Sequence, residues 1–391
     1  MIDLQVPGGE PGIVVCFGEM MTRLSTPGHA RLRQCLPGTL EAGFAGAESN
    51  IASAVALLGG RSRFVTALPA HALGEACVTH LRGCDVDTSC VLRTQRGRLA
   101  QYFIETGAGQ RPGRVLYDRE FSAFSITPGD AYDWDAALAG ASWLVLTGVS
   151  PALSEVAASA TLHAARAARE RGVRVCCDLN FRATLWNWEA GTPARALAQR
   201  VMSGIMPYVD LLLTNPDQAQ DVLGLATGPG PNPAASPSPT AALDNASAKP
   251  PSPPPEMAPL LAGVRRIARS YPQLQLISFT LRESISASHN NLGGMLYDVA
   301  GDRAWMAPLV AGNYVPYAMH QIVDRLGAGD AFAGALLYAL QSPELASPAK
   351  ALEFAVAAGC LAHTIPGDIN FVTREEVEAL CSGDRTGRVV R

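Results

Sequence analysis

The chain has 391 residues, of which 48% are hydrophobic, and this is enough for a large α/β domain with a sizeable core. A formal net charge of −4 and an isoelectric point near 6.0 argue against nucleic acid or an anionic membrane as the main partner. The nine cysteines include no C-x-x-C pair, and no apolar run reaches the length of a bilayer, so we expect a cytoplasmic protein with reduced thiols and no membrane contact.

Apolar runs typical of strands alternate with amphipathic patterns typical of helices. We expect strands at 13–18, 143–148, 173–179, 210–215 and 274–280. We expect helices at 47–59, at 154–172 and around 351–364. This alternation predicts an α/β fold with a mostly parallel sheet that helices cover on both faces. Its ligands should bind beyond the carboxyl ends of the strands.

Two stretches near the N-terminus predict a second, smaller sheet. Residues 98–121 have the pattern of a two-stranded ribbon with a glycine-rich turn, and residues 18–46 can supply further strands. We expect them to form a lid that excludes water from the site. Exposed edge strands often pair between subunits, so a homo-oligomer through the lid is a further expectation.

Residues 226–259 break the alternation because they are rich in proline, alanine and serine. Such a segment cannot bury enough apolar surface to offset the entropy lost on ordering. We therefore expect a disordered surface insertion within a single domain that spans 1–391. A regulatory or partner-binding role for the insertion is the alternative.

The motif "DRLGAGDAFAG" lies between a strand-like run at 319–325 and an apolar helix pattern. Gly327 and Gly329 should therefore lie at a helix N-terminus, where unpaired N–H groups and the helix dipole attract an anion such as phosphate. Asp330 follows on the first turn. With an ordinary aspartate pKa of about 3.9, it should be ionised and able to accept a proton from a hydroxyl group. Alternatively, Asp330 only caps the helix and the glycines form a tight turn.

This motif resembles the C-terminal signature of the ribokinase-like, or PfkB, carbohydrate kinases. The stretch "FAGAESNIASAVALLG" at 44–59 resembles their glycine-rich substrate turn with its downstream asparagine. Within the family, "RVLYDREFSA", "DLNFRATLW" and "HTIPGDIN" are similar to kinases of the sugar acid 2-keto-3-deoxygluconate. The resemblance implies a three-layer α/β/α fold with a β-sheet lid. It also implies ATP and Mg²⁺ as cofactors, with a monovalent cation as a further candidate.

The resemblance assigns roles to residues. Asp330 is the base, and the amides of Gly327, Ala328 and Gly329 stabilise the charge on the transferring phosphate. The substrate-binding residues that it implies are Gly46, Asn50, Tyr102, Tyr117, Arg119, Arg182, Asp330 and Asp368. The nucleotide-binding residues that it implies are Asn180, Asn215, Thr280, Asp324, Gly327 and Gly329. No metal ligand is assigned.

Arg119 and Arg182 are implied to hold the carboxylate or keto end of the sugar acid, because charge-assisted arginine contacts discriminate against neutral sugars. Tyr102 and Tyr117 are implied to separate the sugar from the lid. Taken without the resemblance, Arg119 is an ordinary surface charge, and Arg182 is a surface or phosphate-steering residue.

Two stretches depart from the family pattern. The N-x-x-E element, which the family links to Mg²⁺ and phosphate, is "NPDQ" here, with Gln218 in place of the acid and Asp217 one position away. The glycine-rich run of the nucleotide loop is replaced by "SFTLRESISASHNNLGG". In that stretch, residues 282–288 are either a polar loop that reaches the phosphates or a surface hairpin.

The favoured hypothesis is a kinase that transfers the γ-phosphate of ATP to 2-keto-3-deoxygluconate and produces its 6-phosphate. A kinase of a neutral sugar such as fructose or ribose is the first alternative. A pseudokinase that binds a sugar acid and acts as a sensor is the second, because Gln218 and the unusual nucleotide loop depart from the family.

Overall fold

The computed structural model describes residues 12–225, 227 and 257–383. The strands of its main sheet are β1 (Ile13–Phe17), β4 (Ser62–Pro69), β5 (Val91–Thr94), β8 (Ala141–Thr147), β9 (Arg174–Asp178), β10 (Leu211–Thr214), β11 (Leu276–Ser286), β12 (His289–Asp298), β13 (Arg303–Ala307) and β16 (Tyr317–Met319). Their order is β13-β12-β11-β10-β9-β8-β1-β4-β5, with β16 paired to β12. The strands from β11 to β5 are parallel, and β12, β13 and β16 join antiparallel.

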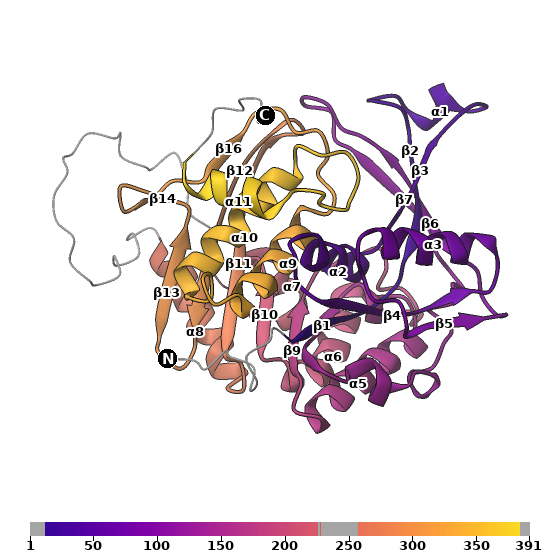
Figure 1. Ribbon diagram of the computed structural model, residues 1–391, viewed down its shortest axis with the longest axis horizontal. Coiled ribbons are helices and arrows are strands. Elements are labelled where there is room, and N and C mark those ends of the chain that lie inside the picture. The colour runs from indigo at the N-terminus through magenta and orange to yellow at the C-terminus, as the bar shows by residue number, and fades with distance from the viewer. Residues whose placement is uncertain (1–11, 226, 228–256, 384–391) are drawn as a thin grey trace.

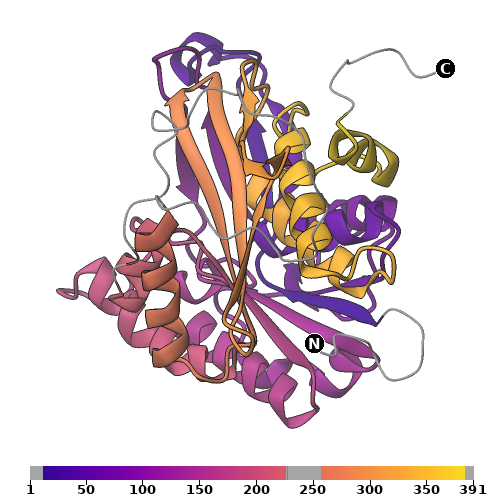
Figure 2. The same ribbon diagram turned by 90° about the vertical axis from the view of Figure 1, so that its left-hand side faces the viewer.

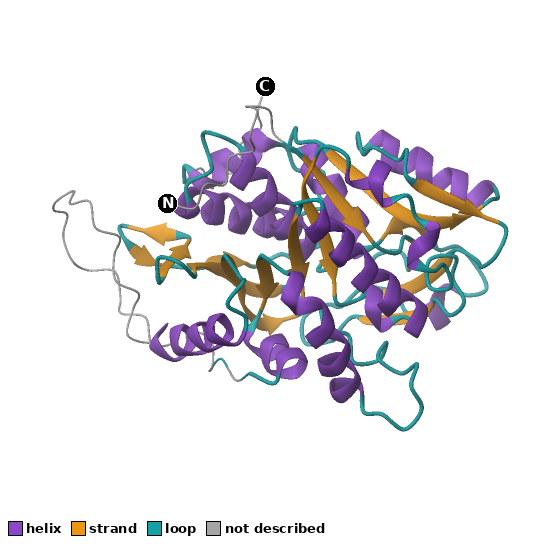
Figure 3. Ribbon diagram, turned by 90° about the horizontal axis from the view of Figure 1, so that it is seen from below, coloured by secondary structure: helices purple, strands orange, loops and turns teal. Residues whose placement is uncertain are grey.

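Helices cover both faces of this sheet, which gives the three layers that the sequence predicted (Figures 2 and 3). One face is covered by α2 (Ala47–Leu57), α3 (Ala72–Gly83), α9 (Ala328–Gln341), α10 (Pro348–Ala362) and α11 (Arg374–Cys381). The other face is covered by α4 (Trp134–Leu138), α5 (Glu155–Glu170), α6 (Ala194–Ile205), α7 (Pro216–Leu223) and α8 (Ala258–Ser270). Among the described residues, no helix is long and apolar enough to cross a membrane.

The central strands are buried on both sides, as their unbroken apolar sequences predicted. In β1, Val14 and Cys16 pack into the hydrophobic layer under α2 and α9, whereas Val15 and Phe17 pack into the layer under α5. This alternation is the period of a strand between two helix layers. Cys176 and Cys177 of β9 are fully buried, and all nine cysteines are free thiols.

A separate four-stranded sheet stands beside the main sheet (Figure 1). Its strands are β2 (Met21–Ser25), β3 (Glu41–Ala45), β6 (Ala100–Glu105) and β7 (Arg114–Asp118), in the order β3-β2-β6-β7. A short helix, α1 (Leu32–Cys35), connects β2 to β3, and a small hairpin of β14 (Leu309–Val310) and β15 (Asn313–Tyr314) lies elsewhere in the chain. The predicted second sheet is therefore present, and its movement as a lid stays a prediction.

One sequence prediction of local structure was wrong. The run 319–325 is not a strand, because β16 ends at Met319 and the chain then turns. The cause is Asp324, whose carboxylate accepts the backbone N–H groups of Arg325 and Leu326 at 2.7 and 3.2 Å, and such local bonds compete with a strand. For residues 282–288 the structure shows the hairpin alternative, because residues 282–286 belong to β11 and the chain then turns into β12.

The predicted insertion falls mostly outside the described residues. Residues 226 and 228–256 are not described, and only Thr227 and residues 257–259 can be placed. Helix α8 begins at Ala258, so the predicted insertion extended two residues too far.

Candidate active site

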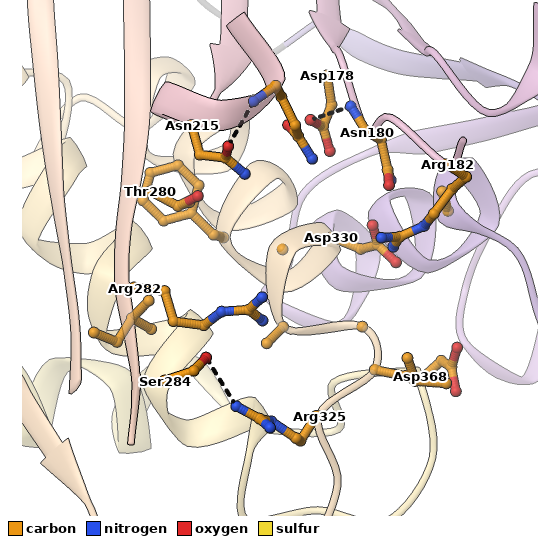
Figure 4. Close-up of a pocket in the computed structure, with 18 of the residues that line it drawn as sticks. Asp178, Asn180, Arg182, Asn215, Thr280, Arg282, Ser284, Arg325, Asp330 and Asp368 are labelled. Carbon is orange, nitrogen blue, oxygen red and sulfur yellow. Dashed lines mark hydrogen bonds between the residues drawn. The ribbon is translucent and has the colours of Figure 1, made fainter. Parts of the chain in front are cut away.

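A cavity of about 1140 Å³ lies between the small sheet and the carboxyl ends of the central strands. This is where an open parallel sheet binds its ligands. All the site residues predicted from the sequence line it: Gly46, Asn50, Tyr102, Tyr117, Arg119, Asn180, Arg182, Asn215, Thr280, Asp324, Gly327, Ala328, Gly329, Asp330 and Asp368. Figure 4 shows one part of the cavity, in which side chains from β11, α7, α9 and the loop after β9 converge.

Helix α9 presents its N-terminus to this cavity, as predicted. Gly327 is the N-cap residue with φ of 79°, and no side chain caps the helix. A Cβ atom at position 327 would lie 1.9 Å from the backbone oxygen of Asp368, so only glycine fits. The first amides of α9 are therefore free to bind an anion.

Asp330 does not cap this helix. Its Oδ2 accepts a hydrogen bond from Asn50 Nδ2 at 2.8 Å, and only 8% of the residue is exposed. Asn50 lies on α2, whose N-terminal Gly46 packs so closely on Glu19 that a Cβ would lie 2.1 Å from the Glu19 backbone oxygen. The two glycine-rich motifs thus meet through the pair Asn50 and Asp330, and the interpretation of Asp330 as a mere helix cap is excluded.

The predicted ordinary pKa of Asp330 was wrong. Burial raises the pKa of Asp330 well above its usual range, the Asn50 hydrogen bond opposes this, and the charge of nearby Asp178 adds to the increase. Burial also raises the pKa of Asp178 itself, to about 6. The sequence expectation counted the helix dipole but not the loss of solvent around the carboxylate.

These shifts predict a pH dependence. A base acts in its ionised form, so turnover should rise with pH through an apparent pKa above the usual aspartate range. Because an ionised Asp178 disfavours the charge on Asp330, Asp178→Asn should move this acidic limb to lower pH. The limb would be measured as kcat against pH, with Asp135→Asn on exposed α4 as control. An unchanged limb, or one at higher pH, would contradict the assignment.

A buried ion-pair network that the sequence did not reveal joins the small sheet to the loops beside α9. Arg23 of β2 donates from Nη2 to Asp324 Oδ2 at 2.5 Å and from Nη1 to Asp368 Oδ1. Tyr102 of β6 donates its hydroxyl to Asp368 Oδ2 at 2.9 Å, and Gly367 N–H donates to Asp324 at 3.1 Å. Arg23 thus holds both Asp324 and Asp368 in place, and its guanidinium group provides the positive charge that pairs with Asp324.

Arg119 also lines this cavity. Arg119 Nε donates a hydrogen bond to Glu19 Oε2 at 2.9 Å, Nη2 forms an ion pair with the same oxygen at 2.7 Å, and both residues are buried. The guanidinium carbon lies 5.2 Å from the ring centroid of Tyr117, and the Tyr117 ring lies 6.2 Å from that of Tyr102. The predicted sugar-facing side chains are therefore held rigidly by partners of their own.

Arg182 follows β9 and lies beside Asp330 in Figure 4. Its charge acts to lower the pKa of both Asp330 and Asp178, although burial outweighs it at each. This position beside Asp330 agrees with the phosphate-steering alternative for Arg182. The binding roles of both arginines stay predictions.

The nucleotide side departs from the family pattern in a way that the structure explains. Asn215 caps α7 by accepting the backbone N–H of Gln218 at 2.9 Å. Gly293 and Gly294 lie on β12 and serve packing, because a Cβ at either would clash with Tyr314 or with Val356. They therefore do not form a phosphate loop.

The model of the pfkB family of carbohydrate kinases matches residues 13–238 and 304–375. The chain belongs to this family. A curated 2-dehydro-3-deoxygalactonokinase from Haloferax volcanii is 29% identical over 96% of this chain and 98% of its own length. A 2-dehydro-3-deoxygluconokinase from Bacillus subtilis is 31% identical over 44% of this chain and 52% of its own length.

Among solved structures, a 2-dehydro-3-deoxygluconokinase from Thermotoga maritima is 36% identical, with a TM-score of 0.79, and the match covers 95% of this chain and all of that one. These matches confirm the predicted pfkB family, the ribokinase-like fold and the carbohydrate kinase class.

Proposed function

We propose that the enzyme transfers the γ-phosphate of ATP to the terminal hydroxyl of a 2-keto-3-deoxy sugar acid, with 2-keto-3-deoxygluconate as the favoured substrate. The observation that carries this proposal is the junction of Asn50, Asp330 and the open N-terminus of α9 inside one cavity. The two kinds of keto-deoxy sugar-acid kinase among the relatives support the substrate class.

In the proposed reaction, Asp330 accepts the proton of the C6 hydroxyl as the C6 oxygen attacks the γ-phosphorus. The bond between the γ-phosphorus and the bridging oxygen breaks, and ADP leaves. The products are the sugar-acid 6-phosphate, ADP and a proton that Asp330 then releases. The amides at the start of α9 stabilise the charge on the transferring phosphate, which is the main need of phosphoryl transfer.

At the sugar end, Arg119 provides the cation that a sugar-acid substrate requires. Arg119 pairs with Glu19 through Nε and Nη2, and the residue lines the cavity. A carboxylate or keto oxygen there gains a charge-assisted contact of roughly 1.5–3 kcal/mol that a neutral sugar lacks. Asp368, fixed by Arg23 and Tyr102, faces the same region and can accept from a sugar hydroxyl.

The cavity also fits the proposed cofactors. Its 1140 Å³ holds a sugar acid and a nucleotide together. The described residues contain no cluster of three or more acidic, histidine or cysteine side chains that could hold a metal alone. Mg²⁺ typically binds through one or two carboxylates together with substrate phosphates, and Asp217 of α7 is a carboxylate at the cavity wall. When bound, Mg²⁺ would neutralise phosphate charge.

The test is ADP formation with ATP, Mg²⁺ and a panel of substrates. The panel contains 2-keto-3-deoxygluconate, its galactonate epimer, fructose, ribose and no sugar. We expect the keto-deoxy acids to exceed the neutral sugars in kcat/KM by at least about tenfold, the discrimination of one charge-assisted contact. A preference for fructose or ribose would establish the neutral-sugar kinase instead. Binding of a sugar acid without ADP release would establish the sensor.

Two further expectations belong to this proposal. Edge strand β7 exposes Val115 and Leu116, 38% and 56% of their surface respectively, which supports self-association through the small sheet.

A cytoplasmic location is proposed from the cysteine content.

A further inference from the structure

We propose that Arg282 and Arg325 are the residues that bind the triphosphate of the donor, and that they do so without needing a protein-held metal ion. This inference rests on the proposed function, since it assigns the donor half of the same cavity. Arg282 begins the segment 282–288, for which contact with the phosphates was one of two alternatives in the sequence analysis, whereas Arg325 was not among the predicted site residues.

Both arginines point into the cavity from different elements. Arg282 extends from β11, and Arg325 comes from the loop immediately before α9 (Figure 4). Arg325 is anchored by hydrogen bonds to neutral partners, to Ser284 Oγ at 3.1 Å and to Asn290 Oδ1. The side chain of Arg282, whose backbone belongs to the β11–β12 ladder, makes no hydrogen bond or ion pair with any part of the chain that the structure describes.

The carboxylates around these arginines are already engaged. Glu283, next to Arg282 on β11, accepts a hydrogen bond from Asn291 Nδ2 at 2.7 Å. Asp324, next to Arg325, is paired with Arg23. Neither Arg282 nor Arg325 forms a salt bridge among the described residues, although burial lowers the pKa of both and mutual repulsion with Arg325 and Arg182 further lowers that of Arg282. Arg282 is exposed at the cavity and Arg325 is partly exposed, so two neighbouring cations without acidic partners are accessible to an anion.

A third group in the same place lacks a partner. His363 is 1% exposed, lines the cavity and places Nδ1 2.8 Å from the Gly359 backbone oxygen, and its Nε2 is buried without any hydrogen bond. Burial lowers the pKa of His363, and Arg282 and Arg325 lower it further, so the ring is neutral. With Nδ1 as the donor to Gly359, Nε2 is an acceptor for a hydroxyl group or a water molecule and does not itself bind ionised phosphate oxygens.

The place of Arg325 in the chain brings it next to the start of α9. Arg325 is two residues before Gly327, the N-cap of α9, so its side chain and the first amides of α9 border the same space. An anion that bridges Arg282, Arg325 and these amides would lie next to Asp330. A triphosphate is such an anion, because successive phosphates can occupy the arginines and the helix N-terminus together.

The test measures binding of inorganic tripolyphosphate, ATP and adenosine by calorimetry in EDTA, with no sugar present. We expect Arg282→Met and Arg325→Met each to weaken tripolyphosphate and ATP by at least about tenfold and to leave adenosine unchanged. Arg282→Lys should recover part of the loss, because it restores charge without the planar fork. Arg265→Met on α8, whose arginine is largely exposed, is the control and should bind like the wild type.

Unchanged tripolyphosphate affinity in both Met variants, or wild-type binding of tripolyphosphate only with added Mg²⁺, would overturn the inference. These outcomes are separable from failure of the proposed function. If the wild type binds ATP through these arginines but phosphorylates no sugar acid, only the proposed function fails. If it phosphorylates a sugar acid and the Met variants keep the wild-type KM for ATP, only this inference fails.

Discussion

Asp330→Asn is expected to lower kcat by about 10²–10⁴-fold, the usual contribution of a general base. The substituted side chain has the same shape, and its amide oxygen can still accept the hydrogen bond from Asn50 that Asp330 Oδ2 accepts at 2.8 Å. Burial already disfavours the ionised carboxylate, so the melting temperature should stay the same or rise. The KM for ATP should change little.

The measurement is kcat from ADP release, with melting temperature and ATP affinity recorded on the same sample. Turnover within tenfold of the wild type would show that another group accepts the proton. A collapse of the melting temperature would show instead that the carboxylate has a structural role.

Arg23→Ala is expected to destabilise the fold and to weaken the sugar site. It leaves Asp324 and Asp368 buried without their cation, and breaking a buried pair in this way costs about 3–5 kcal/mol. The melting temperature should fall by an amount of the order of 10 °C. Because Arg23 also orients Asp368, we expect the KM for the sugar acid to rise by about tenfold or more while the KM for ATP changes less.

Two further variants distinguish a role of Arg23 in positioning Asp368 from a role in the stability of the fold alone. Arg23→Lys keeps a charge but can reach only one carboxylate well. Its melting temperature and its KM for the sugar acid should therefore lie between those of the wild type and Arg23→Ala. Arg265→Ala removes an exposed pair with Asp302 and should cost less than about 1 kcal/mol. Equal increases in both KM values for Arg23→Ala would refute a positioning role, and an unchanged melting temperature would refute the buried network.

The sequence predicted those parts of the molecule that local patterns determine. Strands such as β1 and β9 and the glycine-capped start of α9 follow from apolar runs and from glycine at positive φ. The meeting of Asn50 with Asp330 followed only from the resemblance, because no local pattern links residues 280 positions apart.

The features that the sequence did not predict depend on long-range packing. Arg23 pairs with acids 301 and 345 positions away, and its only local signal is a charged residue on the buried face of β2, between Met21 and Ser25. The raised pKa of Asp330 depends on how closely other segments enclose it, which composition does not report. Arg325 was overlooked although it lies inside the recognised motif, because the glycines and the acid alone explained that motif.

The most direct test of the account is a ³¹P and ¹H NMR spectrum of the product formed by the wild-type enzyme from ATP, Mg²⁺ and 2-keto-3-deoxygluconate. The account predicts one phosphate monoester whose phosphorus couples to the two C6 protons, formed in equal amount to ADP. Inorganic phosphate as the only new signal, or an ester on any other hydroxyl, would contradict it.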